Sequence, residues 1–163
     1  MRKEFILVII AVFLLGWVSN AVLSNLQSNM EIPSGNAIQT NERASPSDWI
    51  KENNIHVLPD KIVIDLNDAR WATFTDTNSM DPLFDSTANA IEIIPQSPNV
   101  IQVGDIISYE SGIAKAMIIH RVIEKGTDEK GVYFILKGDN NNSPDPEKVR
   151  FEQVKRVLVA VIY

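Results

Sequence analysis

Apolar residues are unevenly distributed along the chain, with one long run near the start and many short runs after about residue 60. The long run, Phe5 to Leu23, is interrupted only by Gly16 and the pair Ser19-Asn20. Its nineteen residues would span about 28 Å as a helix, close to the ~30 Å hydrocarbon core of a bilayer. We therefore expect residues 1–23 to be a single-pass membrane anchor.

A cleaved secretory signal is the alternative, with an apolar core from Phe5 to Val18 and a small-residue site after it. Either interpretation exports the rest of the chain. Arg2 and Lys3 precede the apolar run, and no basic residue follows it until Arg43. Because positive charge is retained on the cytoplasmic side, the N-terminus is predicted to be cytoplasmic.

Residues 24–47 are rich in Ser, Asn, Gln and Pro and have no sustained hydrophobic period, which is typical of a flexible tether. The segment Ser47 to Glu52 could form a short helical turn with Ser47 as its N-cap. A folded domain is predicted to occupy residues 48–163.

Short runs rich in Val, Ile, Phe and Tyr, separated by Gly, Pro, Asn or Asp, predict a mostly β domain. Several short strands at this spacing favour a folded-over sheet or barrel over a helical domain. The expected strands are residues 61–66, 70–75, 90–94, 105–109, 115–124, 132–137 and 154–163.

Composition narrows the class of protein further. The chain is 45% hydrophobic, enough for a packed core. Its net charge is -6 and it has no basic cluster, so we expect no nucleic-acid partner. Cysteine is absent, and the two histidines, His56 and His120, are too far apart to suggest a metal site. We therefore expect no metal and no other cofactor.

A serine lies among turn-forming residues in Thr77 to Phe84, directly after the apolar run Trp71 to Phe74. A serine at the end of a strand suits a nucleophile, because its hydroxyl is accessible while rigid backbone fixes its direction. Ser79 is thus a candidate nucleophile. The same residues are also ordinary turn chemistry, in which side chains bond nearby backbone.

His120 lies within the apolar strand segment Ala116 to Ile123. Strand alternation places it on the face of Ile118 and Val122, where loss of solvation favours the neutral form that a general base requires. A histidine satisfied within the core is the alternative. Arg121 projects to the opposite face, where it could pair with a carboxylate and hold the strand.

The segment Lys137 to Pro146 is polar, with Gly138 near its start and two prolines near its end. Asp145 lies between those prolines, which restrict the backbone and could hold its carboxylate against an imidazole. Asp139 and Asp145 could instead only cap the turn.

These segments form four motifs in a fixed order: Ser79-Met80-Asp81-Pro82, Val103-Gly104-Asp105-Ile106-Ile107, Ile119-His120-Arg121-Val122, and Lys137-Gly138-Asp139-Asn140-Asn141 followed by Asp145. Together they resemble signal peptidase I of the archaeal and endoplasmic-reticulum type, over roughly residues 71–163. One motif alone is a weak signal, but four in the family's order are specific. The resemblance implies a mostly β catalytic domain.

By that resemblance, Ser79 is the nucleophile, His120 the base and Asp145 the orienting acid, with Asp139 in support. The bacterial branch of the family uses lysine in place of the histidine. Lys115 is therefore the alternative candidate for the base, although it lies five residues from His120 and on the opposite strand face.

The chain also departs from the family pattern. Family members usually carry Ser-Gly-Ser-Met where this chain has Thr77-Asn78-Ser79-Met80. Thr77 keeps a hydroxyl that could join the Ser79 amide in an oxyanion hole, and Asn78 tolerates positive φ. Residues 85–98 are longer than the family's segment and lack its usual Gly-Asp pair.

The implied activity is removal of N-terminal signal peptides from exported preproteins on the outer face of the cell membrane. Its partners would be the preproteins and the membrane, and the protein export machinery is a candidate partner. Two alternatives remain: an exported β domain that has lost turnover and serves as an interaction module, and a dedicated processing or self-cleaving protease of the same superfamily.

Overall fold

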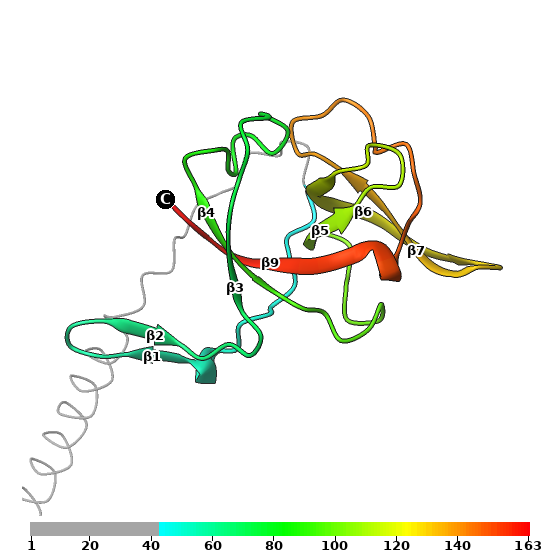
Figure 1. The fold of residues 1–163 in the computed structure, drawn as a ribbon. Helices are drawn as coiled ribbons and strands as arrows, with labels where there is room; N and C mark the ends of the chain where they lie inside the picture. Colours follow the sequence, from blue (N-terminus) through cyan, green and yellow to red (C-terminus); the bar gives the residue numbers. More distant parts are fainter. Residues whose placement is uncertain (1–42) are drawn as a thin grey trace, which may run out of the picture. The chain divides into compact units, whose positions relative to one another are not determined.

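The chain is mostly β, as expected. A computed structural model describes residues 43–163 (Figure 1). The predicted membrane anchor and nearly all of the predicted tether lie outside these residues. Within the described range, no helix has the length and apolarity that a membrane crossing requires.

Seven antiparallel strands form the main sheet, in the order β3-β4-β9-β5-β6-β7-β8 (Figure 1). A second sheet pairs β1 with β2 in a hairpin that carries His56. The strands are β1 (Ile55–Val57), β2 (Ile62–Ile64), β3 (Arg70–Thr73), β4 (Asn89–Ile93), β5 (Ile106–Glu110), β6 (Met117–Asp128), β7 (Gly131–Lys137), β8 (Val149–Arg150) and β9 (Val154–Ile162).

Each predicted strand corresponds to one of these, and the sequence analysis missed β1, β8 and two short 3-10 helices, η1 (Glu52–Asn54) and η2 (Phe151–Gln153). The predicted N-cap at Ser47 is wrong. Lys51 occupies that position, and the Ser47 amide donates to Asp105 Oδ1 at 2.6 Å. Asp105 is fully buried and also accepts from Trp49 Nε1, so a tertiary contact outcompetes the local cap.

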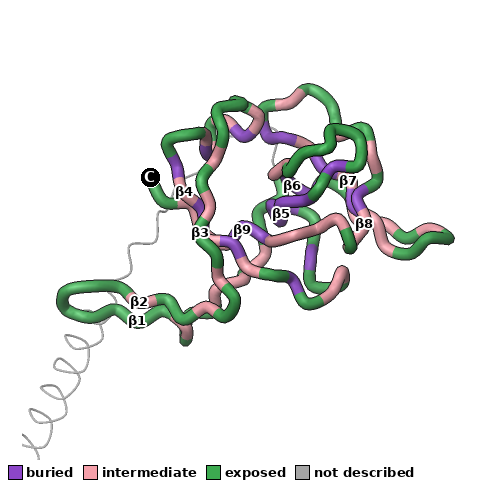
Figure 2. Tube along the Cα trace, viewed as in Figure 1, coloured by how far each residue is buried: buried purple, intermediate pink, exposed green. Residues whose placement is uncertain are grey.

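Strand β5 is buried on both faces, and its successive residues belong to different cores (Figure 2). Ile107 and Tyr109 pack in a cluster with Val122 and Phe134. Ile106, from the intervening face, packs in a second cluster with Met80 and other residues. The second cluster also receives side chains from β3 and β6, so two strands that are not neighbours in the sheet contribute to the same core.

Arg121 on β6 forms the central polar contact of the domain. Its Nε and Nη2 donate to the two carboxylate oxygens of Asp139 at 2.8 and 2.6 Å, and its Nη1 donates to the Gly104 carbonyl at 2.8 Å. Both charged side chains are more than nine-tenths buried. The expected pairing of Arg121 with a carboxylate is therefore confirmed, and it ties the loop after β7 to β6.

We expect Asp139→Ala to lower the free energy of unfolding by about 3–5 kcal/mol, because it leaves the Arg121 charge buried and uncompensated. Chemical denaturation measures the change. Glu110→Ala is the control, since it breaks an exposed pair with Lys155 at 3.0 Å and should cost less than about 1 kcal/mol. Equal small losses for both variants would show that the Arg121 pair does not hold the domain together.

Candidate active site

The Ser79 turn is docked by its backbone on the loop after β7. The Ser79 carbonyl accepts from the Asn140 amide at 2.9 Å, and the Asn78 carbonyl accepts from Asn140 Nδ2 at 2.9 Å. A Cβ at Gly138 would lie 2.6 Å from the Ser79 carbonyl oxygen, so only glycine permits this approach. Two of the sequence motifs are thus joined directly, across nearly sixty residues.

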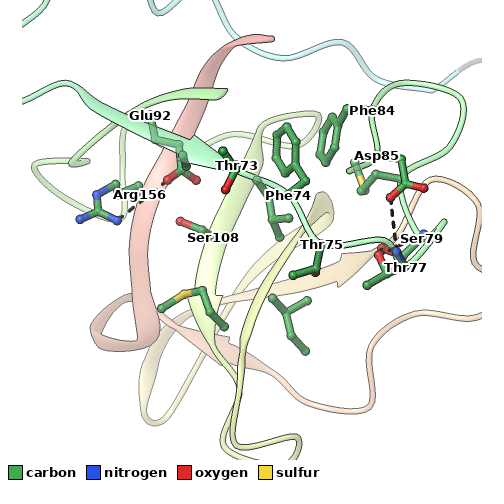
Figure 3. Close-up of a pocket in the computed structure, with 15 residues that line it drawn as sticks. Thr73, Phe74, Thr75, Thr77, Ser79, Phe84, Asp85, Glu92, Ser108 and Arg156 are labelled. Carbon is green, nitrogen blue, oxygen red and sulfur yellow. Dashed lines mark hydrogen bonds and ion pairs between the residues drawn. The ribbon is translucent and has the colours of Figure 1, made fainter. Parts of the chain in front are cut away.

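Ser79 itself is half-buried, and Thr77 is its immediate polar neighbour. Their hydroxyl oxygens lie 3.1 Å apart, and the Ser79 amide donates to Thr77 Oγ1 over a long 3.5 Å contact. Asn78 between them has φ +56°, which confirms that this asparagine adopts the positive φ expected of it in the turn. Asp85 accepts from the Thr77 amide at 3.3 Å and fixes the start of the turn (Figure 3).

His120, near the start of β6, and Asp145, in the loop after β7, are brought together. His120 Nδ1 lies 2.9 Å from Asp145 Oδ1 and 2.8 Å from Oδ2, and each side chain is 8% exposed. Since a carboxylate only accepts, Nδ1 must carry the proton. In the neutral imidazole, Nε2 then carries the free lone pair, which is the arrangement a general base needs.

The second ring nitrogen of His120, Nε2, has no hydrogen-bond partner among residues 43–163. Across residues 43–163, the enclosed side-chain polar atoms without a hydrogen-bond partner are Ser108 Oγ and Arg156 Nε. Nε2 is not one of these enclosed atoms. Within this range, the imidazole is held at Nδ1 alone.

Asp145 is held by more than its flanking prolines. Its amide donates to the Leu136 carbonyl at 2.8 Å, and the Tyr109 hydroxyl donates to its Oδ2 at 2.8 Å. Sequence reasoning did not find Tyr109. It lies thirty-six residues away on another strand, and a tyrosine in an apolar strand is most simply explained as core.

Asp139 is not part of the His120 pair. Its carboxylate contacts Arg121, with Arg43 Nη1 at 3.8 Å, and it forms no hydrogen bond to His120 or Asp145. The reason is strand alternation, because Arg121 and His120 project to opposite faces of β6. The support expected from Asp139 is therefore structural and acts through the loop.

Ser79 is not hydrogen-bonded to His120, since its hydroxyl contacts Thr77 instead. A cavity of about 270 Å³ opens beside Ser79, but His120 and Asp145 do not line it. Lys115, the rival base, does not line it either and lies in the turn between β5 and β6 with φ +53°. The structure therefore brings the candidate base His120 and the candidate acid Asp145 together, and places the candidate nucleophile Ser79 on a loop bonded to the segment that leads to Asp145.

The cavity runs from a hydroxyl-bearing end to a charged end (Figure 3). Thr77 and Ser79 mark the first end, and Glu92 with Arg156 marks the second. Phe74, stacked on Phe84 at 4.0 Å between ring centroids, lies between them. Met117, Ile118 and Ile119 of β6 supply an apolar stretch of the wall.

Glu92 is a buried carboxylate at the charged end of this cavity. Burial raises the pKa of Glu92, while the Ser108 hydroxyl and the Arg156 guanidinium oppose that shift. The Arg156 Nη1 atom lies 3.9 Å from Glu92 Oε2, and the Ser108 hydroxyl points toward the carboxylate (Figure 3).

Comparison with known proteins identifies neither a family nor a fold. No family model matches the chain, and no solved structure matches it. An uncharacterized protein of Methanocaldococcus jannaschii is 48% identical over 44 residues, which cover 27% of this chain and 22% of that protein. The chain thus aligns with about a fifth of that relative's length, and the relative's printed name assigns no activity.

The raised pKa of Glu92 predicts a pH-dependent stability. The folded protein holds this proton more tightly than the unfolded chain, so the contribution is present below the ordinary value of 4.5 and is lost as the pH rises above it. We expect Glu92→Gln to lose less stability than the parent when the pH is raised from 4.5 to neutrality. Denaturation series at several pH values measure this. Glu110→Gln, at an exposed position, should keep the parental slope, and an unchanged slope in Glu92→Gln would contradict the assignment.

Proposed function

We propose that the chain is a membrane-tethered serine endopeptidase of the signal peptidase I class, which removes signal peptides from preproteins on the outer face of the membrane. One observation carries the proposal: the buried His120–Asp145 pair, with Nδ1 held by the carboxylate and Nε2 without a hydrogen-bond partner among residues 43–163. The backbone contact between Ser79 and Asn140 supports it, because it fixes a serine turn to the loop that leads to Asp145.

In the proposed reaction, Ser79 Oγ attacks the scissile carbonyl and His120 Nε2 takes its proton, which it then donates to the leaving amine. Asp145 keeps the imidazole in the required tautomer. The Ser79 amide, with the Thr77 hydroxyl, would stabilise the oxyanion. This requires the Ser79 side chain to exchange its contact with Thr77 for one with His120, a rotamer change of a kind expected because catalytic hydrogen bonds often form fully only with substrate bound.

The strands beside Ser79 are suited to an extended peptide. Residues 117–120 of β6 pair with β5 only, because the pairing with β7 begins at Arg121, and β3 pairs with β4 only. Residues of both strands line the cavity beside Ser79. A polypeptide could therefore add to an unpaired edge by backbone hydrogen bonds and place its side chains in the cavity.

A membrane anchor would make modest peptide affinity sufficient. Preproteins are themselves held at the membrane, so a tethered catalyst meets them at a raised effective concentration. The apolar run Phe5 to Leu23 supports this part of the proposal, with the export machinery as a candidate partner.

A second candidate is a non-catalytic exported domain that binds peptides. The contact of the Ser79 hydroxyl with Thr77 rather than with His120 favours it, together with the absence of His120 and Asp145 from the cavity lining. The same peptide edge would serve such a module without turnover. A cleavage assay separates the two candidates.

We expect Ser79→Ala and His120→Ala each to lower preprotein cleavage by roughly 10⁴-fold or more, because each removes one member of a unit that acts together. The assay uses the purified full-length chain in detergent, with products identified by mass spectrometry. His56→Ala is the matched control, since His56 also contacts an aspartate, with Nε2 3.0 Å from Asp65 Oδ2, but is exposed in the β1–β2 hairpin. Folded Ser79→Ala or His120→Ala protein with parental activity would refute the proposal, as would a parent chain that cleaves nothing.

Cleavage should also fall toward acid pH, because a protonated imidazole cannot accept the Ser79 proton. The measurement is kcat/KM between pH 5 and 8 for the parent and for His56→Ala, which should share one profile. A profile that stays flat toward acid pH would argue against a histidine base.

A further inference from the structure

The Asp145 carboxylate is shared between His120 and a second buried side chain, Tyr109. The Tyr109 hydroxyl donates to Asp145 Oδ2 at 2.8 Å, and His120 Nδ1 lies 2.8 Å from the same oxygen. Tyr109 is fully buried on β5, and residues 109 and 107 pair with Ile118 and His120 on β6. The three groups therefore form one hydrogen-bonded chain on one face of the sheet.

In this series of hydrogen bonds, the Tyr109 hydroxyl is always the donor and Asp145 the acceptor. Burial raises the pKa of Tyr109 well above its ordinary value of 10.0, and the hydrogen bond and negative charge of Asp145, with the charge of Glu147, raise it further. The hydroxyl therefore keeps its proton at any physiological pH. Because a carboxylate cannot donate, the direction of the hydrogen bond is fixed.

The position of the loop relative to β5 is fixed by a second, parallel contact. Ser111, two residues beyond Tyr109, donates its hydroxyl to Glu147, two residues beyond Asp145. Glu147 also accepts from the Gly112 amide at 3.2 Å and from Gln153 Nε2 at 3.1 Å. Tyr109 and Ser111 are two residues apart, and so are their partners Asp145 and Glu147. The two contacts together fix the loop relative to β5, and this position places Asp145 against Tyr109.

We propose that Tyr109 is a positioning residue, which holds the Asp145 carboxylate in place against His120 and neutralises part of its charge. The structural part of this proposal concerns the resting protein, and its effect on cleavage rests on the proposed function. Without the hydroxyl, Asp145 would present more of its negative charge to the imidazole, and one of the contacts that orient its carboxylate would be lost.

The test is Tyr109→Phe in the full-length chain carrying His56→Gln, which leaves His120 as the single histidine. Protonation of His120 is followed by NMR across a pH series. We expect it to occur at higher pH in Tyr109→Phe, because a less neutralised carboxylate stabilises the imidazolium. Glu147, on the Asp145 loop, and the Arg121–Asp139 pair, on the opposite face of β6, are the other charged groups around this site and are unchanged in the variant.

Cleavage gives a second readout. We expect kcat/KM at neutral pH to fall about 10-fold, the scale of losing one hydrogen bond to a charged group, and its decline at acid pH to move in the same direction as the NMR midpoint. In an Asp145→Asn background, Tyr109→Phe should add little further loss, because the two residues act through one contact.

Tyr133→Phe is the matched control. It also removes a tyrosine hydroxyl bonded to a carboxylate, Glu124, at 3.1 Å, but on β7 away from His120. It should leave both readouts at the parental values. The unmodified chain supplies a further measurement if Tyr109→Phe does not fold: the Tyr109 hydroxyl proton should exchange slowly and show a cross-peak to the His120 ring system.

Three results would each overturn the proposal. The first is unchanged His120 protonation in folded Tyr109→Phe, and the second is an equal effect of Tyr133→Phe. The third is additive losses when Tyr109→Phe is combined with Asp145→Asn. A fast-exchanging Tyr109 hydroxyl would also overturn it. If the NMR shift occurs but the parent chain cleaves no preprotein, the proposed function fails and the positioning role stands. If the parent cleaves and no shift occurs, only the positioning role fails.

Discussion

The buried ion pair between Arg121 and Asp139 is the contact on which the rest of the structure depends. It joins β6 to the loop after β7, and the third donor of Arg121 adds the Gly104 carbonyl at the start of β5. A charge placed in the interior is tolerated only when its hydrogen bonds are complete. The loop must therefore place Asp139 against Arg121, and this contact fixes its position. The Ser79 turn docks on the same loop through Asn140.

Two adjacent residues of β6 serve different purposes, because one belongs to the buried ion pair and the other to the candidate site. Arg121 pairs with Asp139 on one face of the strand. His120 contacts Asp145 on the other face, where Tyr109 donates to the same carboxylate. The loop after β7 repeats this division, since Asp139 serves the ion pair and Asp145 serves the imidazole. Because the loop is fixed at Asp139 and again at Glu147, the intervening Asp145 is held from both sides.

The serine turn of the candidate site is held through its backbone, whereas its side-chain hydroxyl contacts Thr77 of the same turn. Its backbone is fixed by Asn140 and by the close approach of Gly138, while its hydroxyl bonds locally to Thr77. An arrangement with rigid backbone and a side chain able to change rotamer suits a nucleophile that awaits substrate, and it equally suits a peptide-binding turn. The cavity beside it, apolar along β6 and charged at Glu92, would contact a peptide in either case.

The sequence by itself determined seven of the nine strands of the described residues, because alternation of apolar residues and the turn residues between them are local signals, and it missed the short strands β1 and β8. It also singled out His120 and Asp145, whose residue types and motif order are visible without a structure. Only the tertiary structure decided that Asp139 belongs to Arg121, that Ser47 bonds to Asp105, and that Tyr109 completes the His120–Asp145 contact. These are side-chain pairs far apart in sequence, and which of several acids a buried donor meets depends on strand register and loop position, which no local pattern encodes.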